Sequence, residues 1–359
     1  MSGPARIAAR LVAAAVFALA LSACRPVAVV SCLSAKAGTP VCEVDNPEDL
    51  ARFADTPWIL FPQGRTGAAR APLALLNVGS KAVQAPHVTY PSEPTPARWG
   101  DAACDMAPPL PQYRGIDVRR EDDGSYRVAA INGSARQRIE LFEGTADAGG
   151  VELSWVGCVR VPDLYFLNDV AIGPDGQLFA THMFYRPEGL RQYYLMAKFL
   201  AGAQTGFVVS WSGEGGWKRV RNSYASFPNG IAVDRFGHTV YMAATYNSTV
   251  SRIEVATGKR KDMILPIRPD NITWTDSGAL LLAGNTAVRL IGTLGCAELA
   301  KPGCGFPFAV TEVDPELSRR RTLFSQSGGD IPGASVALQA GNALFLGSAF
   351  ADRITIVTP

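Results

Sequence analysis

The feature that most restricts the fold of this chain is a weak internal repeat, in which a polar residue precedes alternating apolar residues and a later glycine. In the clearest unit, Asn168 begins the stretch Asn-Asp-Val-Ala-Ile, and Gly176 follows eight positions after it. Units that begin at Asn229 and Asp270 repeat the pattern, with apolar residues two and four positions on and a glycine at the eighth. Such alternation, followed by a turn glycine and a second apolar run, is typical of a β-hairpin.

Three weaker copies extend the repeat to six units, whose first residues are Glu48, Arg114, Asn168, Asn229, Asp270 and Gly333. The units are separated by 41 to 66 residues, a spacing that suits propeller blades of several strands each. We therefore predict an all-β fold, a six-bladed β-propeller whose four-stranded blades surround a central channel. The alternative is a β-sandwich built from unrelated hairpins. The 35 glycines and 25 prolines agree with the many turns that either fold requires.

Composition excludes several classes of protein. Lys and Arg total 34 against 32 Asp and Glu, and this balance argues against a nucleic-acid-binding protein, which needs a concentrated basic patch. Hydrophobic residues make up 47% of the chain and charged residues 18%, which is the composition of a folded protein and not of a disordered one. Three histidines are too few for a histidine-rich metal site, and no Cys-x-x-Cys pair of the zinc-binding kind occurs.

Residues 1–23 read as a targeting signal that is removed from the mature protein. Two arginines precede an apolar run over 11–21 that is too short to span a bilayer. Residues 21–24 read Leu-Ser-Ala-Cys and resemble a bacterial lipobox, which predicts cleavage before Cys24 and attachment of lipid to its thiol. The alternative is an ordinary secretory signal. Both place the protein outside the cytoplasm, and the lipobox predicts an anchor in the bacterial cell envelope, at the outer membrane facing the periplasm.

We expect residues 24–43 to form a tether and residues 44–359 to form a single propeller domain. A proline-rich segment over 63–112 is expected to be a surface excursion of that domain. If Cys24 carries lipid, six cysteines remain in an oxidising compartment and allow 15 disulfide connectivities. Of these we favour the set Cys32–Cys42, Cys104–Cys158 and Cys296–Cys304. The first and third close short loops, and the second is left by elimination.

The first residues of the units predict a metal site, because the innermost strand of every propeller blade lines the channel. Equivalent residues of the blades should therefore form a ring around the axis. Oxygen donors predominate in this ring: Glu48, Asn168, Asn229 and Asp270, with Asn271 next to the last. Calcium prefers such oxygen ligands, and two carboxylates balance its charge. Any one of these residues alone would instead suit a turn cap, but their recurrence at one phase of the repeat favours a metal in the central channel.

At several of these positions the sequence resembles the paraoxonase/arylesterase family, within a superfamily that includes gluconolactonases, regucalcin-like proteins and strictosidine-synthase-like proteins. The resemblance covers most of residues 40–359 and lies in short motifs at 48–50, 166–170, 228–231, 270–272 and 347–350. It implies a six-bladed propeller with a catalytic calcium, whose ligands match Glu48, Asn168, Asn229, Asp270 and Asn271. It also implies a second, structural calcium, whose side-chain ligands match Asp49 and Asp169. Adjacent strand residues point to opposite sides, so such doublets can serve two ions.

The sequence departs from this family at the proposed histidine base. The position of the first histidine is Arg114, and the second matches about Gly133, so no histidine dyad can act here. The family's ring-closing disulfide also lacks a partner, because residues 353–359 contain no cysteine. Other branches of the superfamily do without the dyad, so its loss does not by itself imply an inactive protein.

We expect a calcium-dependent hydrolase of esters or lactones, an arylesterase- or lactonase-like enzyme with a small-molecule substrate. Calcium would polarise the substrate carbonyl, and Asp270 or Glu48 would take a proton from water or attack directly. Arg114 would supply positive charge to the developing oxyanion or to a substrate carboxylate, or else form a surface ion pair. One alternative is a non-catalytic binding propeller of the cell envelope with structural calcium. Another is strictosidine-synthase-like formation of carbon–carbon bonds.

An aromatic stretch over 184–203 falls between two units, where a propeller places its face loops. We expect it either to wall the active site or to form a short helix that packs on the core. His182, which lies just before this stretch, has no matching partner and is expected to be structural.

Overall fold

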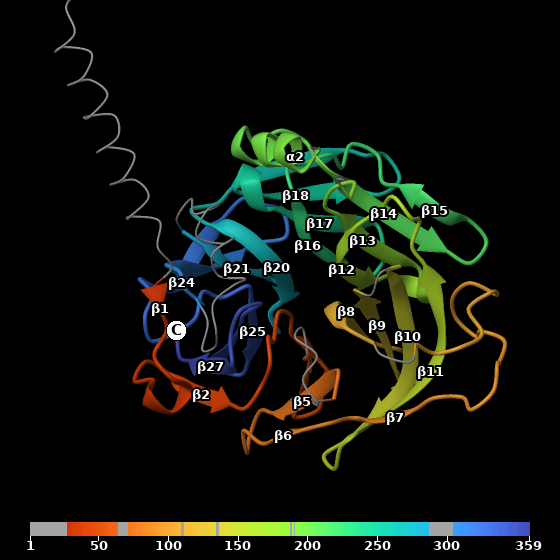
Figure 1. Cartoon of the computed structure of the whole chain (residues 1–359), viewed down its shortest axis with the longest axis horizontal. Coiled ribbons are helices and arrows are strands. Elements are labelled where there is room, and N and C mark those ends of the chain that lie inside the picture. The colour runs from red at the N-terminus through yellow and green to blue at the C-terminus, as the bar shows by residue number, and fades with distance from the viewer. Residues whose placement is uncertain are drawn as a thin grey trace, which may run out of the picture.

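The computed structural model describes residues 27–63, 71–108, 111–133, 136–186, 189, 191–286 and 304–359. Its strands form six small sheets that stand around a common centre like the blades of a propeller (Figure 1). The arrangement confirms the predicted all-β, six-bladed β-propeller. The signal predicted at residues 1–23 and the lipidation predicted at Cys24 lie outside the described residues.

The blades are numbered in chain order, and their strands are given from the innermost to the outermost. Blade 1 contains β3 (Ala51–Arg52), β4 (Trp58–Pro62), β5 (Leu73–Asn77) and β6 (Val83–Gln84). Blade 2 contains β8 (Tyr113–Arg120), β9 (Tyr126–Asn132), β10 (Arg138–Ala146), β11 (Val151–Arg160) and β7 (His87–Thr89), the last parallel to β11. Blade 3 contains β12 (Leu167–Ile172), β13 (Leu178–His182), β14 (Phe207–Ser212) and β15 (Gly216–Arg219).

The remaining blades also have four strands each, so the predicted strand number holds for every blade except blade 2. Blade 4 contains β16 (Pro228–Val233), β17 (Thr239–Ala244), β18 (Thr249–Glu254) and β19 (Arg260–Ile264). Blade 5 contains β20 (Arg268–Trp274), β21 (Leu280–Asn285), β23 (Phe308–Val313) and β24 (Arg320–Gln326). Blade 6 contains β25 (Val336–Ala340), β26 (Ala343–Gly347), β27 (Arg353–Val357) and β2 (Thr39–Cys42). A separate pair joins β1 (Val27–Ala28) to β22 (Cys304–Gly305).

The hydrophobic core is divided into clusters that lie between neighbouring blades. Strand β4 shows why, because Trp58 and Leu60 pack toward blade 2, whereas Ile59 and Phe61 pack toward blade 6. Successive side chains of a strand point to opposite sides, so an uninterrupted apolar run fills two interfaces at once. Burial of one such side chain contributes about 1.5–3 kcal/mol, and contacts of this kind therefore hold the blades around the channel.

Segments from the two ends of the chain close the ring. Strand β2 pairs antiparallel with β27, so that Thr39 lies opposite Ile356 in blade 6. The prediction of a tether over 24–43 is therefore wrong at its C-terminal end, because residues 39–42 belong to the propeller. An outermost strand buries few side chains, here only Val41, and its sequence signal is correspondingly weak.

Two of the predicted disulfides are present, Cys32–Cys42 and Cys104–Cys158. The second attaches the proline-rich segment to β11. For the third predicted pair, Cys296 lies outside the described residues. The proline-rich segment is less of an excursion than expected, because it supplies β5, β6 and β7.

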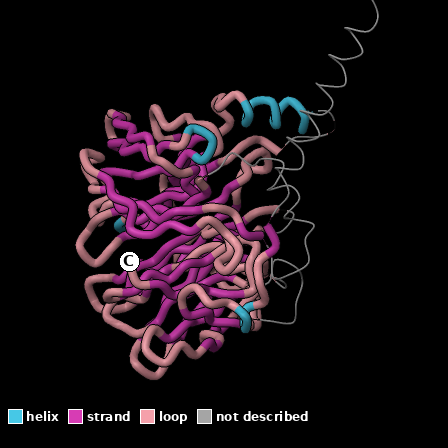
Figure 2. The backbone as a smooth tube through the Cα atoms, turned by 90° about the vertical axis from the view of Figure 1, so that its left-hand side faces the viewer, coloured by secondary structure: helices cyan, strands magenta, loops and turns pink. Residues whose placement is uncertain are grey.

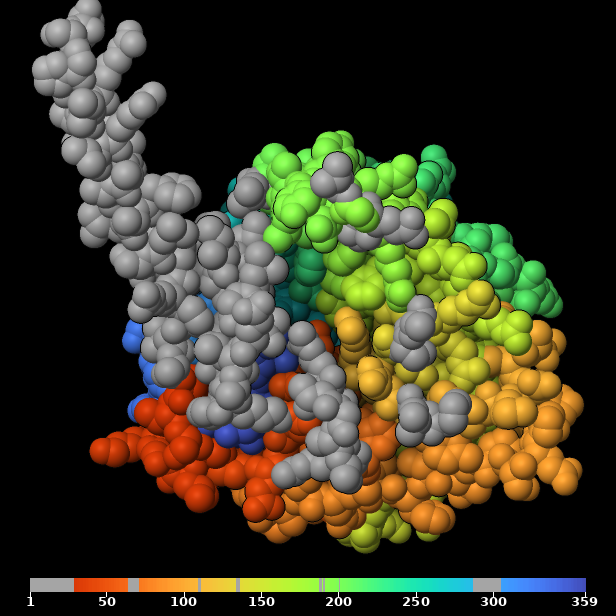
Figure 3. All heavy atoms as spheres, viewed as in Figure 1, coloured from red at the N-terminus to blue at the C-terminus, as the bar shows by residue number. Residues whose placement is uncertain are grey.

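Helix α2 (Arg191–Leu200) lies on one face of the propeller. Figure 2, turned by 90°, places it on the side of the molecule that faces the viewer in Figure 1. In the space-filling view, the green side chains of this region form the upper edge of that face (Figure 3). No described helix has the length and apolar content needed to cross a membrane.

Candidate metal centre and active site

The ring residues predicted from the repeat lie where the innermost strands begin. Arg114, Asn168 and Asn229 are the second residues of β8, β12 and β16. Asp270 is the third residue of β20, and Glu48 lies shortly before β3. The innermost strands contact one another around the channel, so residues at their starts meet at one end of it (Figure 1).

The strands are irregular at this level. In β8, β12, β16 and β20, pairing with the second strand of the blade is interrupted over residues 114–115, 168–169, 229–230 and 270–271. Such an interruption frees the backbone from the ladder and changes where a side chain points. The repeat predicts where these residues lie but not this irregularity.

Hydrogen bonds connect the candidate ligands to one another. The Nδ2 of Asn168 donates to the Oδ1 of Asn229, and the Asn229 side chain is also hydrogen-bonded to Asp270. The Nδ2 of Asn229 donates in addition to the Oγ1 of Thr245 at 3.1 Å. Asn168 and Asn229 are both buried. The structure thus brings together residues of three different blades, as the ring hypothesis requires.

Asn271 has a buried oxygen without a hydrogen-bond partner. Its Nδ2 donates to the backbone oxygen of Glu48 at 2.8 Å, whereas its Oδ1 accepts no hydrogen bond from the described residues. The residue is only 2% exposed, so water does not readily replace the missing donor. Leaving such an oxygen unpaired costs about 1–3 kcal/mol, whereas an Asn carbonyl oxygen is an ordinary calcium ligand.

The carboxylates at this end of the channel repel one another. Burial raises the pKa of Asp270 well above its usual range, and the nearby charges of Glu48 and Asp49 raise it further. The hydrogen bond with Asn229 acts in the opposite direction. A divalent cation would relieve this repulsion, so the oxygen donors fit calcium. Within the described residues, no group of three or more His, Cys, Asp or Glu side chains is arranged to hold a metal, so such a site would depend on the amides.

Three buried or half-buried aspartates join neighbouring blades, and we call them the clasp carboxylates. One oxygen of each accepts the N–H of the next residue in the chain. The other oxygen accepts an N–H from the following blade: Asp49 from Ile116 (2.8 Å), Asp117 from Ile172 (2.7 Å) and Asp169 from Ile231 (2.8 Å). A buried hydrogen bond contributes about 0.5–1.5 kcal/mol, so the clasps stabilise contacts between the first four blades.

Asp49 and Asp169 are the residues predicted to hold a structural calcium. Burial raises the pKa of Asp49 to about 8, and burial together with the charge of Asp49 raises that of Asp169 well above its usual range. The two carboxylates are therefore close enough to interact. Each keeps lone pairs beyond its two backbone hydrogen bonds, and a second cation between them stays a prediction.

Glycines make room for these carboxylates. A Cβ at Gly115 would lie 2.8 Å from Oδ1 of Asp169 and 2.4 Å from the backbone oxygen of Asn168. A Cβ at Gly230 would lie 2.5 Å from the backbone oxygen of Asp270. Around the first four blades the position after the ring residue is therefore Asp49, Gly115, Asp169 and Gly230 in turn. This alternation is visible in the sequence and would have indicated close backbone packing there.

Arg114 occupies the space where the resemblance would place a histidine dyad. Its guanidinium carbon lies 5.5 Å from the centre of the Phe166 ring, and it forms no hydrogen bond or ion pair with the described residues. A Cβ at Gly133, the position of the second histidine, would lie 2.7 Å from the Arg114 Nε. The two positions are thus neighbours, and the glycine leaves room for the longer arginine.

His182 is fully buried among aromatic rings. Its Nδ1 accepts the N–H of Phe166 at 3.1 Å, and its ring lies 4.6–4.8 Å from the rings of Tyr165, Tyr185 and Phe207. Burial lowers its pKa to about 4. A neutral, enclosed imidazole supports the structural role expected for this residue.

The aromatic stretch forms the short packing helix considered for it, and its role as a wall of the active site stays a prediction. Phe199 of α2 is buried and contacts the rings of Phe184, Phe227 and Tyr246, with centres 5.0–5.8 Å apart. Phe227 precedes Asn229 by two residues, so the helix packs on side chains that border the ring. Tyr193 and Tyr194 on the helix are exposed.

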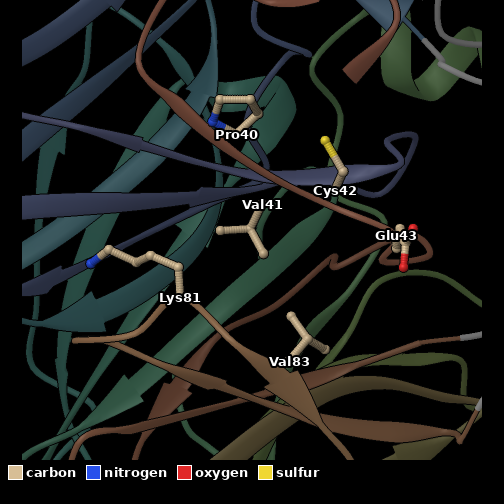
Figure 4. A pocket seen from close by; sticks show the side chains of 6 residues that line it. All are labelled: Pro40, Val41, Cys42, Glu43, Lys81 and Val83. Carbon is tan, nitrogen blue, oxygen red and sulfur yellow. The ribbon is translucent and has the colours of Figure 1, made fainter. Parts of the chain in front are cut away.

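A pocket of about 420 Å³ lies away from the channel, at the rim where blade 6 meets blade 1 (Figure 4). Its lining residues come from β2, β6 and the adjoining loops: Pro40, Val41, Cys42, Glu43, Lys81 and Val83. Cys42 is bonded to Cys32, so the pocket offers no free thiol. We therefore place the candidate chemistry in the channel.

Known proteins share this fold. The family model described as Arylesterase matches residues 112–355. A putative gluconolactonase has a TM-score of 0.51 and 13% identity, covering 93% of this chain and 97% of that chain. A luciferin-regenerating enzyme has a TM-score of 0.51 and 13% identity, covering 89% of this chain and 92% of that chain. A gluconolactonase from Xanthomonas campestris has a TM-score of 0.50 and 15% identity, with 93% and 95% covered. No curated protein matches the sequence.

Proposed function

Because the chain belongs to the arylesterase family, we propose that it is a calcium-dependent hydrolase of esters or lactones, with its active site where the ring residues meet. The observation that carries the proposal is the set of converging oxygen donors, above all the buried and unpaired Oδ1 of Asn271. Two structural neighbours, a putative gluconolactonase and a gluconolactonase, agree with lactone or ester chemistry on this fold.

In this proposal the catalytic calcium is held by two carboxylates and three amides: Glu48, Asp270, Asn168, Asn229 and Asn271. The two negative charges balance the divalent ion, and the amides complete a set of oxygen ligands. We further propose a structural calcium at Asp49 and Asp169, where the same need to neutralise two nearby carboxylates exists.

The side chains of the chain itself have distinct roles in hydrolysis. When bound, calcium supplies a Lewis acid that polarises the ester carbonyl. Asp270 is suited to take a proton from water or to attack directly, because it is a carboxylate among the ring residues where the substrate carbonyl would bind. Glu48, which lies just before β3 of blade 1, is the second candidate for this role. Arg114 holds a positive charge for the oxygen that becomes anionic during attack.

Removal of calcium tests this proposal directly. We expect the purified protein to hydrolyse an aryl acetate or a small lactone, and to lose at least about a hundredfold of that activity when EGTA removes calcium. Activity should return on addition of calcium. Hydrolysis that is unchanged in EGTA would contradict the proposal.

A non-catalytic propeller with structural calcium gives a different result. Asn229→Ala removes one proposed ligand, and in a hydrolase it should abolish turnover while the circular dichroism spectrum stays that of the wild type. Gln84→Ala, on the exposed outermost strand of blade 1, is a control that should keep full activity. A wild-type protein that binds calcium but hydrolyses no ester or lactone would favour the binding propeller.

We also propose that the protein is exported and anchored through lipid on Cys24. The two disulfides agree with an oxidising compartment. In a bacterial host fed labelled palmitate, the wild-type protein should carry label in the envelope fraction, and Cys24→Ala should not. Label that remains on Cys24→Ala would exclude this anchor.

A further inference from the structure

Four half-buried aromatic side chains form a continuous series beside the ring residues, and we call them the aromatic collar: Phe166, Phe184, Phe227 and Tyr246. The ring centres of Phe166 and Phe184 are 5.1 Å apart, those of Phe184 and Phe227 5.9 Å, and those of Phe227 and Tyr246 5.4 Å. Phe166 and Phe227 each precede a ring amide by two residues. The collar therefore offers flat apolar surface at the end of the channel that holds the candidate ligands.

The guanidinium groups of three arginines lie over rings of this collar. The guanidinium carbons of Arg114 and Arg186 lie 5.5 Å and 5.0 Å from the centre of the Phe166 ring. That of Arg268 lies 5.1 Å from the centre of the Tyr246 ring. Contact with an aromatic face holds a cation in place without neutralising it. Two guanidinium groups beside one ring repel each other, and an anion that reaches both relieves this repulsion.

Among the described residues, no carboxylate cancels the positive charge of Arg114 or Arg268 in the calcium-loaded protein. Glu48 and Asp270 balance the two charges of the ion. Arg114 and Arg268 form no ion pair with the described residues. Asp163 and Arg136 line a small pocket together with Arg186.

We propose that the collar and its arginines select esters and lactones that carry a carboxylate on a flat aromatic body. The inference rests on the hydrolase proposed above and specifies its substrate class. The aromatic body would pack against the collar beside the ring residues. Its carboxylate would pair with guanidinium groups, whose planar donors match two carboxylate oxygens.

A pair of matched esters tests the selection. With calcium present, we expect kcat/KM for 4-acetoxybenzoate to exceed that for its neutral methyl ester by about tenfold, the size of one hydrogen bond to a charged group. The double variant Arg186→Gln, Arg268→Gln should bring the ratio of the two kcat/KM values close to one. Arg320→Gln, which removes an arginine from the outermost strand of blade 5, should leave the ratio unchanged. The preference should also weaken as salt increases.

Binding of the product acid separates failure of this inference from failure of the hydrolase proposal. Titration calorimetry with calcium present should show 4-hydroxybenzoate binding about tenfold more tightly than the neutral 4-hydroxybenzamide. Preferential binding without hydrolysis of either ester would overturn the hydrolase and leave the anion selectivity standing. Calcium-dependent hydrolysis of the neutral ester with equal binding of the two ligands would overturn the selectivity alone.

Discussion

Adjacent residues of one strand have opposite surroundings in this propeller. In the pair Asn168-Asp169, the carboxylate of Asp169 accepts two backbone N–H groups and joins blade 3 to blade 4. The side chain of Asn168 instead meets the side chains of other ring residues. Glu48 and Asp49 show the same division. The comparison teaches that neighbouring acidic and amide residues need not have the same role. One residue of each pair holds blades together, at what we call the clasp level, and the other is available to a cation, at the ligand level.

Substitution at the ligand level should give the largest effect, and it should act on activity. Asp270→Asn keeps the size of the side chain but removes the charge that calcium and the proton transfer require. We expect kcat/KM for an aryl acetate to fall by about a thousandfold, roughly 4 kcal/mol. The unfolding free energy of the calcium-free variant should not fall, because a repelling charge has been removed. Wild-type turnover in this variant would assign Asp270 to structure.

Asp276→Asn is the matched control for that change. Asp276 belongs to the same blade, but its side chain is 68% exposed and pairs with Arg52 at the surface. Activity and stability should both stay close to those of the wild type, since exposed ion pairs contribute little.

Gly115→Ala should give the next largest effect, and it should act on stability. Its Cβ would lie 2.4 Å from a backbone oxygen of blade 3, so the innermost strands would have to move apart. We expect the unfolding free energy to fall by about 3 kcal/mol. Gly278→Ala is the comparison, because a Cβ there meets nothing within 4 Å and only the positive φ of 79° opposes it. Its cost should be about 1 kcal/mol, and equal losses in the two variants would argue against close packing at Gly115.

Asp169→Ala should lower the unfolding free energy by about 2 kcal/mol in calcium-free protein, because two buried N–H groups lose their acceptor. Relief of the repulsion with Asp49 offsets part of this loss. Denaturant titration measures the change. If added calcium stabilises the wild type but not Asp169→Ala, the clasp carboxylate is also a calcium ligand, and the division between the two levels is less sharp in blade 3.

The smallest effect is a pH dependence at Asp117. Burial raises its pKa to about 6 in the folded protein from the ordinary 3.8. Between these values the folded state binds more protons than the unfolded state, so the unfolding free energy should fall as pH rises from about 4 to about 6. The Asp117→Asn variant should lack a part of this fall on the order of 1 kcal/mol. Identical pH profiles for the variant and the wild type would show that Asp117 does not titrate in this range.

Much of the fold and the ring could be predicted from sequence, because inner strands are buried on both sides. The alternating apolar residues after Asn168, Asn229 and Asp270 indicate that the inner strands are buried. The turn glycine eight positions after each of these residues shows which residues of the units are equivalent. Outer strands were harder to predict. Strand β2 buries only Val41, and β6 buries no residue, so neither carries a strong periodic signal.

The surroundings of the site could be predicted less well than its residues. That Asn271 leaves an oxygen unpaired and that Asp169 binds two backbone N–H groups depends on backbone irregularities with no residue signature of their own. The placement of Arg114 and Arg186 over Phe166 and of Arg268 over Tyr246 arises from blades that meet only in the folded ring. Single residues can be read from a repeat, whereas their partners come from the closure of the whole structure.

That closure has a consequence for how the chain reaches its native state. Strand β2 is synthesised long before its partner β27. Blade 6 therefore stays incomplete, with the edge of β2 unpaired, until the chain has been made through β27. Contacts between such distant segments form slowly. Removal of β27 would open the circle at this seam, and the ring of candidate ligands, assembled from blades on both sides of it, would lose its fixed diameter.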